Sequence, residues 1–454
     1  MPLTSFFSAL SGLNANSFSI NTIGNNLANL NTLGFKGGRA HFKDLLSSTV
    51  GFNGAGAAVQ LGLGVTLAGI QNLFTQGSIQ STAVPTDVAI QGNGFFVLGL
   101  SGAQGTNLVY SRAGNFGIDV QGNLINSQGL LVQGYPVTVS GGTIQQTGSL
   151  GPLRIPVGSL MTPRATSSIQ LGANLSARMP LSGPGSTFTM DITVYDSLGG
   201  DHKVNFVFAR TSLSGTFTFD VTVDGGEVVG GTAGTPFSLL SGATAGAAPG
   251  RLTFDSSGSL TGVSVSGTAV TPPVLDVRFP PSAVQFTNGS RILSNGLTWN
   301  VTRRAGATVG ASEYLMTAFD ATSQATVKTQ NGFASGTLDS IAIAANGVIQ
   351  GKFSNQQIVP LGQLAMASFA NPEGLIKAGD NLFLSSSLGS GEPNIGVPGT
   401  STRGTVVGGA LEMSNVDMAS EFTQLIIAQR GYQANSRVIT TSDEVFQEAI
   451  RLIR

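Results

Sequence analysis

The chain has 454 residues, enough for two or three domains, and its formal net charge of −1 gives no reason to expect a nucleic acid or an acidic membrane surface as partner. Charged residues make up only 10% of the chain and glycines number 63, which favours a β-rich protein with tight turns and a surface that meets other protein. The absence of cysteine excludes disulfides, thiolate nucleophiles and thiolate metal sites.

The N-terminal segment has the pattern of an amphipathic helix without charges. Apolar residues recur at alternating spacings of three and four over residues 3–27, which places them on one stripe of a helix. No Asp, Glu, Lys or Arg precedes Lys36, although a helix with one wet face normally carries charges there. We therefore expect this helix to pack against protein on several sides or to line a mildly polar channel. The apolar stripe positions are Leu3, Phe6, Leu10, Leu13, Ile20 and Leu27.

The same segment is a poor membrane span and a poor export signal. No run of about 18 apolar residues exists anywhere in the chain, so no transmembrane helix is expected. The N-terminus lacks a positive region followed by a continuous apolar core, unlike a secretory signal peptide. If the protein leaves the cytoplasm, we expect a route that needs no cleaved signal.

The run "NNLANLNTLGFK", residues 25–36, is expected to end this helix. Asn29 and Asn31 can bond to nearby backbone and compete with helical hydrogen bonds. Gly34 permits a left-handed turn after the last helical carbonyls. Phe35 is then a buried anchor and Lys36 the first group outside the uncharged core. An ordinary helix end followed by a loop gives the same local geometry.

The next segments are expected to form strands of a β layer. "GFFVLGL" (94–100), "LVYSRAGNFGID" (108–119) and "NLINSQGLLVQGYPV" (123–137) form one group. "SIAIAANGVIQGKF" (340–353) forms another, with Asn346-Gly347 as a two-residue hairpin turn. If the two groups pair, they form one discontinuous β domain.

Between them lies a block that is expected to be antiparallel β. Residues 188–196 and 203–210 alternate on either side of a "SLGGDH" turn, and 216–223 repeats the alternation before a further turn signal. Shorter strands are expected at 251–254, 275–279 and 297–302, the last of which holds the only tryptophan, Trp299.

The C-terminal segment repeats the helical stripe. A helix is expected from about residue 416 to the end, with Ser414 as N-cap and Asp417 three residues later. Most charges there lie off the stripe. The apolar stripe positions are Met418, Phe422, Leu425, Tyr432, Ile439, Phe446 and Ile450.

Neither stripe can be buried by its own helix, because an isolated helix of this length is marginal in water. The predicted fold is therefore mixed but mainly β, with terminal α-helices that pair as a coiled coil and carry nested, discontinuous antiparallel β domains. A helical hairpin within one subunit and an assembly element buried on polymerisation both fit the stripes, and the uncharged first helix favours assembly. The expected divisions are an axial helical domain (1–30 and 411–454), a linker (31–75), a middle β domain (76–167 and 331–410) and an inserted outer β domain (168–330).

Catalytic candidates are scarce. The only histidines are His41, in the expected polar linker, and His202, in a predicted hairpin turn where a solvated surface residue is the usual reading. No G-x-S-x-G nucleophile elbow, Walker motif or dinucleotide fingerprint occurs, and two distant histidines without cysteine do not suggest zinc. We expect no catalytic, cofactor-binding or metal site.

Four blocks in order carry a resemblance to a known family. "ANLNTLGFK" (28–36) resembles the signature shared by rod and hook proteins of the bacterial flagellum. "YSRAGNFGIDVQGNLINSQGLLVQGYP" (110–136) resembles the strand-rich segment of their middle domain, and "ANPEGL" (370–375) and residues 409–454 resemble their closing segments. An insertion of about 160 residues, whose start resembles the outer domain of hook proteins, favours a hook protein over a distal rod protein.

The resemblance implies a structural subunit of an extracellular tube. Terminal helices would form a coiled coil around a central channel, with the β domains as outer shells, and the hook would be a curved flexible joint that transmits motor torque to the filament. The implied partners are copies of the same chain and the hook-cap, distal-rod and hook-filament junction proteins. No cofactor, nucleic acid or membrane insertion is implied. A β-rich extracellular adhesin on a helical stalk is the rival class, and an enzyme is a distant third.

Overall fold

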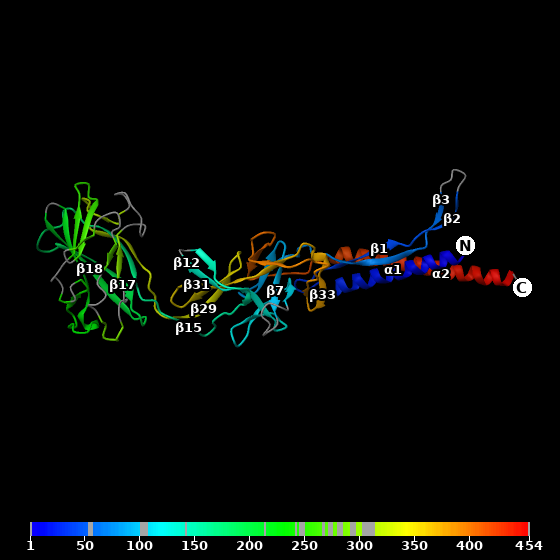
Figure 1. The fold of residues 1–454 in the computed structure, drawn as a ribbon, viewed down its shortest axis with the longest axis horizontal. Helices are drawn as coiled ribbons and strands as arrows, with labels where there is room; N and C mark the ends of the chain where they lie inside the picture. Colours follow the sequence, from blue (N-terminus) through cyan, green and yellow to red (C-terminus); the bar gives the residue numbers. More distant parts are fainter. Residues whose placement is uncertain are drawn as a thin grey trace. The chain divides into compact units, whose positions relative to one another are not determined.

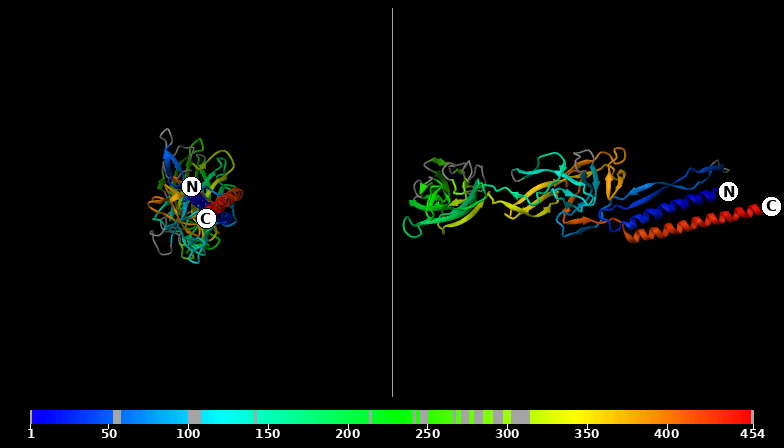
Figure 2. Two further views of the ribbon diagram at one scale, coloured as in Figure 1. Left: turned by 90° about the vertical axis from the view of Figure 1, so that its right-hand side faces the viewer. Right: turned by 90° about the horizontal axis from the view of Figure 1, so that it is seen from below.

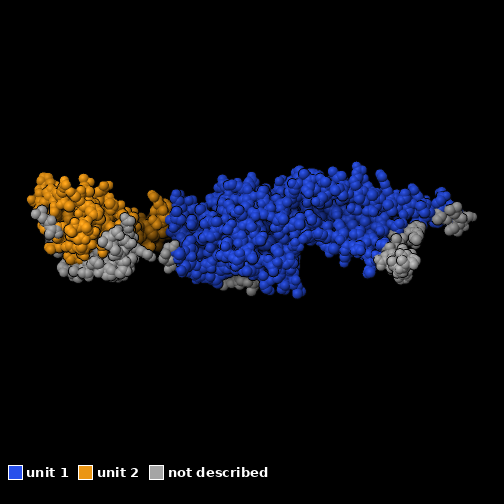
Figure 3. Space-filling model, turned by 90° about the horizontal axis from the view of Figure 1, so that it is seen from above, with its two compact units in different colours: residues 1–157, 339–352, 358–454 blue, residues 158–338, 353–357 orange. Residues whose placement is uncertain are grey.

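The chain forms two compact units (Figure 3). The computed structural model describes residues 2–52, 58–99, 108–140, 143–212, 215–240, 243–244, 250–265, 268–270, 276–278, 285–290, 297–301 and 314–452. Unit 1 comprises residues 1–157, 339–352 and 358–454, and unit 2 comprises residues 158–338 and 353–357.

Unit 1 contains both helices and a β layer. Its elements are α1 (Pro2–Ala28), β1 (Gly38–Asp44), β2 (Ser48–Phe52), β3 (Ala58–Leu61), β4 (Val65–Asn72), β5 (Ile79–Ser81), β6 (Val88–Gln91), β7 (Phe95–Gly99), β8 (Leu108–Ser111), β9 (Gly117–Ile118), β10 (Leu124–Ile125), β11 (Leu131–Tyr135), β12 (Val137–Ser140), β13 (Thr143–Gln146), β14 (Gly151–Pro152), β31 (Ile358–Leu364), β32 (Met366–Ser368), η3 (Pro372–Gly374), β33 (Ile376–Gly379), β34 (Leu382–Leu384), β35 (Asn394–Gly396), β36 (Thr405–Gly408), β37 (Ala410–Glu412) and α2 (Met418–Leu452). The chain passes between the units within β29 (Gly336–Ile343) and β30 (Val348–Phe353).

The β layer of unit 1 joins segments from both sides of the inserted residues. Strand β7 pairs with β8, β11 and β32, while β8 pairs with β34 and β11 with β31, all antiparallel. Its core includes the buried rings of Phe95, Tyr110 and Phe383. The phenylalanine rings at 74, 95, 369 and 383 meet edge to face, which is the favoured geometry for aromatic pairs.

Helices α1 and α2 lie side by side and antiparallel, with both chain termini at the same end of the pair (Figures 1 and 2). A second neighbour of α1 is the hairpin of β1 and β4, which runs along it; the Val65 N–H donates to the Ser11 Oγ at 3.1 Å. No strand was expected in residues 31–75, although β1 alternates in burial; β4 does not alternate, and most residues of both strands are only partly buried or exposed. Contact with α2 and with this hairpin explains why α1 tolerates no charge along most of its length.

Unit 2 contains two sheets. Its elements are β15 (Leu160–Met161), β16 (Ser168–Asn174), β17 (Thr187–Tyr195), β18 (Asp201–Ser212), β19 (Thr216–Asp224), η1 (Gly225–Glu227), β20 (Pro236–Ser238), β21 (Ala243–Thr244), β22 (Gly250–Phe254), β23 (Leu260–Val265), β24 (Thr268–Val270), β25 (Asp276–Arg278), β26 (Thr298–Asn300), β27 (Met316–Thr317) and β28 (Gln324–Gln330). One sheet runs β17-β18-β19-β22-β23-β24; β20 also pairs with β19, and β21 pairs with β20. The other is ordered β25-β26-β16-β27, and β28 also pairs with β16.

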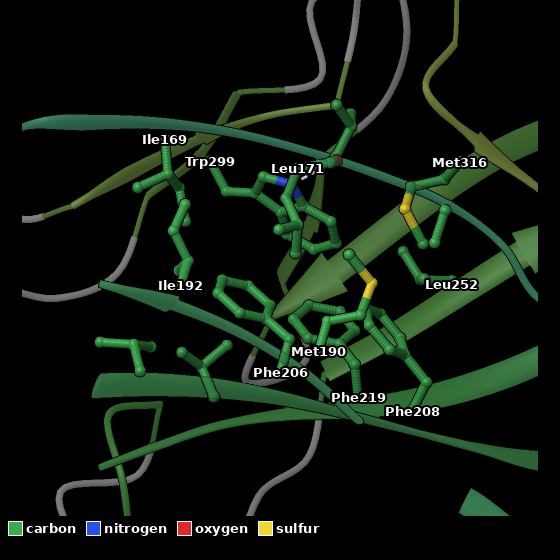
Figure 4. Close-up of a cluster of buried hydrophobic side chains, with 14 of the residues drawn as sticks. Ile169, Leu171, Met190, Ile192, Phe206, Phe208, Phe219, Leu252, Trp299 and Met316 are labelled. Carbon is green, nitrogen blue, oxygen red and sulfur yellow. Dashed lines mark hydrogen bonds between the residues drawn. The ribbon is translucent and has the colours of Figure 1, made fainter. Parts of the chain in front are cut away.

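The core of unit 2 lies between these sheets (Figure 4). The fully buried Trp299 is surrounded by the rings of Phe206, Phe208 and Phe219, and its Nε1–H donates to the backbone oxygen of Leu171 at 3.1 Å. The alternation of large apolar side chains along β17, β18 and β19 places them on this one face. As the only tryptophan of the chain, Trp299 makes its fluorescence a specific signal for the folding of unit 2.

The predicted fold class is confirmed: a mainly β chain with two terminal helices that pair. The expected hairpin of 188–196 and 203–210 corresponds to β17 and β18, and Gly347 takes a positive φ of 79° in the predicted Asn-Gly turn. The block is not wholly antiparallel, since β16 pairs in parallel with β26 and β27. Residue 100 and the ends of the strands expected at 275–279 and 297–302 lie outside the described residues. In the part of the chain that is described, no helix is long and apolar enough to cross a membrane.

Candidate assembly interface: the terminal helix pair and its junction

Helices α1 and α2 meet in a defined register. The Nδ2 of Asn26 donates to the Oε1 of Glu421 at 3.0 Å. Near the other end of α1, Gly12 lies so close to Asn435 that a Cβ on the glycine would stand 2.8 Å from the amide nitrogen. Glycine permits this approach because it has no side chain. The two contacts advance in opposite directions along the helices, as an antiparallel pair requires.

The seam between the helices is built mainly from small and polar residues. Five of the ten seam residues named below lie one position before a member of the predicted stripe, as Ala9 precedes Leu10 and Gly431 precedes Tyr432. Because one residue turns a helix by about 100°, the predicted stripe lies beside the seam rather than in it. The seam residues are Ala9, Gly12, Asn16, Ile23 and Asn26 on α1, and Glu421, Ala428, Gly431, Asn435 and Ser442 on α2.

The predicted stripe residues are therefore only partly covered within one chain. Half-buried members are Phe6, Leu13, Ile20, Leu27, Leu425, Ile439 and Phe446. Exposed members are Leu10, Met418, Phe422, Tyr432 and Ile450. The side chain of Leu3 lies outside the described residues.

Further large apolar side chains are exposed around the stripes. The side chain of Ile427 is 65% exposed, compared with 48% for the stripe residue Phe422. Others of this kind are Phe7, Phe18, Ile426, Val438 and Val445. Apolar exposure repeated along two adjacent helices exceeds the scattered single residues usual on a monomer. The helix pair thus has apolar surface available for contact with further protein.

The N-cap of α2 differs from the one expected. The carboxylate of Asp417 accepts a hydrogen bond from the Ser420 N–H at 2.7 Å, and the helix begins at Met418. Ser414 instead accepts from the Val416 N–H. Asp417 is the effective cap because its carboxylate reaches the third N–H of the helix and its charge favours the positive end of the helix dipole.

Helix α1 ends at Ala28, and the asparagines after it bond locally. The Nδ2 of Asn29 donates to the backbone oxygen of Asn25 at 2.9 Å, and its Oδ1 accepts from the Thr32 hydroxyl at 3.0 Å. The side chain of Asn31 is exposed. Side chains that bond to nearby groups in this way stabilise the end of a helix.

Gly34 is the tightest point of the junction. It has a φ of 65°, its N–H donates to the backbone oxygen of Glu412 at 2.8 Å, and a Cβ would stand 2.7 Å from the Ala113 backbone nitrogen. We expect Gly34→Ala to lower the free energy of unfolding of unit 1 by roughly 2–4 kcal/mol, the sum of left-handed strain and overpacking. Gly69→Ala, where nothing stands near the new Cβ, is the control.

Urea unfolding followed by far-UV circular dichroism measures this loss, while the Trp299 transition in unit 2 should stay in place. Equal effects of the two alanine variants would show that Gly34 is not constrained by its surroundings.

The two residues after Gly34 are both buried. Phe35 lies in the unit 1 interior with the Nζ of Lys377 5.3 Å from the centre of its ring, within cation–π range. Lys36 was expected as the first group outside the uncharged core, yet its side chain is fully buried. The first charged residue of the chain is therefore buried inside the junction that follows the uncharged helix.

Lys36 belongs to a buried ion network centred on Glu412. The Lys36 Nζ lies 2.5 Å from the Glu412 Oε1 and donates to the Thr75 oxygen at 2.7 Å. The Arg112 Nη1 lies 3.2 Å from the Glu412 Oε2, and the Gly77 N–H also donates to this carboxylate. Two cations thus share one carboxylate. The network links residues near both chain ends to the β layer.

Burial and the Glu412 carboxylate shift the pKa values of the two cations in opposite directions. Burial lowers the pKa of Lys36 and the pKa of Arg112, because a low-dielectric interior disfavours the charged forms. The Glu412 carboxylate opposes both shifts by attraction and hydrogen bonding. The charge state of the junction therefore depends on this one acid.

Two asparagine side chains in the junction form the hydrogen bonds that a neighbouring strand would otherwise form with the backbone. The Nδ2 of Asn26 donates to the Gly38 oxygen and its Oδ1 accepts from the Gly38 N–H, each at 2.9 Å. Asn415 accepts from the Gly37 N–H at 2.9 Å and donates to the Leu73 oxygen at 2.7 Å. Each amide replaces one peptide unit of a strand partner.

Asn26, Arg112, Glu412 and Asn415 were not expected from the sequence to be junction residues. Their partners lie up to 376 residues away along the chain, as for Lys36 and Glu412, and a single sequence contains no signal for such pairs. The available hint was Lys36 itself, since a first cation after 35 uncharged residues calls for an acid from another segment.

The two histidines differ from their predicted settings. His41 lies on strand β1 with its Nε2 2.6 Å from the Gln71 Oε1. His202 was read as a solvated turn residue, and this is wrong: it lies on β18 and its side chain is 8% exposed. The β17–β18 turn is shorter than expected, so strand pairing reaches His202 and faces it inward. Among the described residues, no group of three His, Cys, Asp or Glu side chains could hold a metal ion.

Four segments of the chain match known protein families. Residues 7–36 match the "Flagella basal body rod protein" family, and residues 89–174 the "Flagellar hook protein FlgE/F/G D1 domain". Residues 177–333 match the "Flagellar basal body protein FlaE D2 domain", and residues 407–452 the "Flagellar basal body rod FlgEFG protein C-terminal" family. These four matches define the class as the axial proteins of the flagellar rod and hook.

Full-length relatives narrow the class. The flagellar hook protein FlgE of Treponema pallidum is 34% identical over 100% of both chains, and that of Escherichia coli is 34% identical over 98% of this chain and 99% of its own. The solved structure of Helicobacter pylori flagellar hook protein FlgE2 shares the fold, with a TM-score of 0.50 and 14% identity over 72% of this chain and 98% of that one. The chain belongs to the flagellar hook protein family, a family of structural subunits, which confirms the expected hook protein over the rival adhesin.

Proposed function

We propose that copies of this chain assemble through their terminal helices into the curved, flexible tube of the flagellar hook, which transmits motor torque to the filament. The observation that carries the proposal is the apolar stripe beside the small-residue seam. One chain uses the seam to pair α1 with α2, so the stripe stays free to pack against neighbouring copies. Burial of such a stripe supplies the free energy of polymerisation.

In this proposal the junction residues from Asn29 to Lys36 fix the direction in which the β domains leave the helices. The axial domain consists of residues 1–30 and 411–454, with residues 31–75 beside it. Residues 76–167 and 331–410 form a middle shell, and residues 168–330 an outer one. A rigid buried junction passes torque from the axial helices to these shells, because an ion network held on all sides has little freedom to bend.

The proposed partners follow from the position of a hook. Copies of the chain form the tube itself, the distal rod protein meets one end, and the hook-cap and hook-filament junction proteins meet the other. The subunit reaches its extracellular site by flagellar export without a cleaved signal peptide. Its low charge and lack of cysteine suit passage as an unfolded chain.

The test is polymerisation of the purified protein. Sedimentation measures the assembled fraction and electron microscopy its form. Hollow tubes support the proposal, whereas monomers or thin fibres with affinity for a ligand would favour an adhesin.

We expect deletion of residues 168–330 to leave tube formation intact while altering curvature and surface contacts. The reason is that the helix pair and the ion network lie wholly within unit 1. Electron microscopy of the shortened protein checks this, and complete loss of tubes would place an essential assembly contact in the outer domain.

A further inference from the structure

A buried histidine in unit 2 holds two carboxylates. The His202 Nε2 lies 3.0 Å from the Asp196 Oδ2, and its Nδ1 lies 2.7 Å from the Glu227 Oε2. The ring stacks on Phe286, with 3.5 Å between the ring centres and an angle of 10°. Among the described residues, these two carboxylates are the charged groups that contact the ring.

Asp196 is fixed in its ionised form. Its carboxylate accepts from the Ser290 hydroxyl and the Asn288 amide, both at 2.6 Å, and from the N–H groups of Leu198 and Gly200, both at 2.8 Å. Burial alone would raise its pKa, but the hydrogen bonds from Ser290, Asn288 and His202 outweigh burial and hold the pKa well below its ordinary value. Asp196 therefore always requires a donor at the His202 Nε2.

The second contact then depends on a proton. A neutral imidazole has one N–H, so with Nε2 donating to Asp196 its Nδ1 would turn a lone pair toward the Glu227 carboxylate. The imidazolium has two N–H groups and satisfies both acids. We propose that His202 is a proton-dependent latch that holds the segment 285–290 to the η1 turn.

The backbone around Glu227 transmits the state of the latch. The Thr287 N–H donates to the backbone oxygen of Glu227 at 2.9 Å, and the Val229 N–H donates to the backbone oxygen of Gln285 at 2.8 Å. The Glu227 side chain is 41% exposed and can turn to water when the proton leaves, whereas Asp196 is fully buried and cannot. Loss of the proton thus releases the Glu227 side of the latch and loosens the two backbone bonds.

The direction of the pH dependence follows. The latch binds a proton in its closed form, so its stabilising effect is present at low pH and disappears as the pH rises. Measurements at pH 5 and at pH 9 therefore compare the closed and the released latch.

Hydrogen exchange of the full-length monomer, followed by mass spectrometry, tests the latch. The readout is protection, corrected for intrinsic exchange, in peptides that cover residues 224–230 and 285–290. We expect protection of the wild type to fall by at least roughly tenfold between pH 5 and pH 9, the effect of losing one charge-assisted hydrogen bond. Constant protection across this range would overturn the proposal.

Glu227→Gln provides the decisive variant. Its side-chain amide can donate to a neutral Nδ1, so the latch should remain closed at both pH values and protection should stay constant. Asp201→Asn removes a neighbouring exposed acid that does not touch the ring, and it should keep the fall seen in the wild type. If Glu227→Gln lost protection with pH as the wild type does, His202 would not be the titrating latch.

Discussion

Replacing Glu412 by glutamine should lower the free energy of unfolding of unit 1 by about 3–5 kcal/mol, because it leaves the buried cations Lys36 and Arg112 without a counter-charge. Urea unfolding followed by far-UV circular dichroism measures the loss. The Trp299 fluorescence transition reports unit 2 and should be unchanged. Asp339→Asn, at an exposed acid of the same unit, is the matched control and should have little effect.

Two further measurements separate buried charge from lost packing. The double variant Glu412→Gln with Lys36→Met should recover part of the stability, since one of the two unpaired cations is gone. In the single variant, stability should improve as the pH rises toward 10. Burial lowers the pKa of Lys36, so the unfolded chain binds more protons in that range and high pH favours the folded state. A deficit that is independent of pH and of Lys36 would contradict the electrostatic explanation.

Replacing Phe422 by aspartate should abolish polymerisation while leaving the monomer folded. The side chain is 48% exposed in the single chain, so the substitution has little effect on the fold of the monomer. In the proposed tube the same position is buried against another copy, where an unpaired carboxylate costs several kcal/mol. Sedimentation of the assembled protein measures the effect, and circular dichroism confirms the fold.

Thr440→Asp is the matched control for Phe422→Asp. It places the same charge on an exposed polar position of α2, outside the predicted stripe. It should assemble far better than Phe422→Asp. Polymer yield at the wild-type level from Phe422→Asp would remove this side chain from the assembly interface.

The stripes illustrate what periodicity can and cannot provide. Spacings of three and four identified both helices, their ends within a few residues, and the class of protein that needs two such stripes. They did not identify the seam, because Ala9, Gly12 and Gly431 have no hydrophobic signal and become seam residues only when the helices approach closely. Large stripe residues such as Leu10 and Tyr432 produce the periodic signal, and their exposed side chains are available for contact with other protein.

The β domains show a similar division between local and distant information. The hairpin of β17 and β18 followed from alternation and a glycine-rich turn, which are local features. The setting of His202 did not follow, because two of its three neighbours, Glu227 and the ring of Phe286, come from separate segments, and only Asp196 is local. Lys36 was likewise recognised as the boundary of the uncharged segment, but its burial depends on Glu412 at the far end of the chain.

The most direct test of the account is a high-resolution electron microscopy map of the polymer formed by the purified protein. We predict a hollow tube in which the terminal helices lie at the axis and Leu10, Phe422 and Tyr432 pack against neighbouring copies, while the small-residue seam stays within each subunit. A polymer held together by the β domains alone, with these three side chains facing solvent, would contradict assembly through the terminal helices.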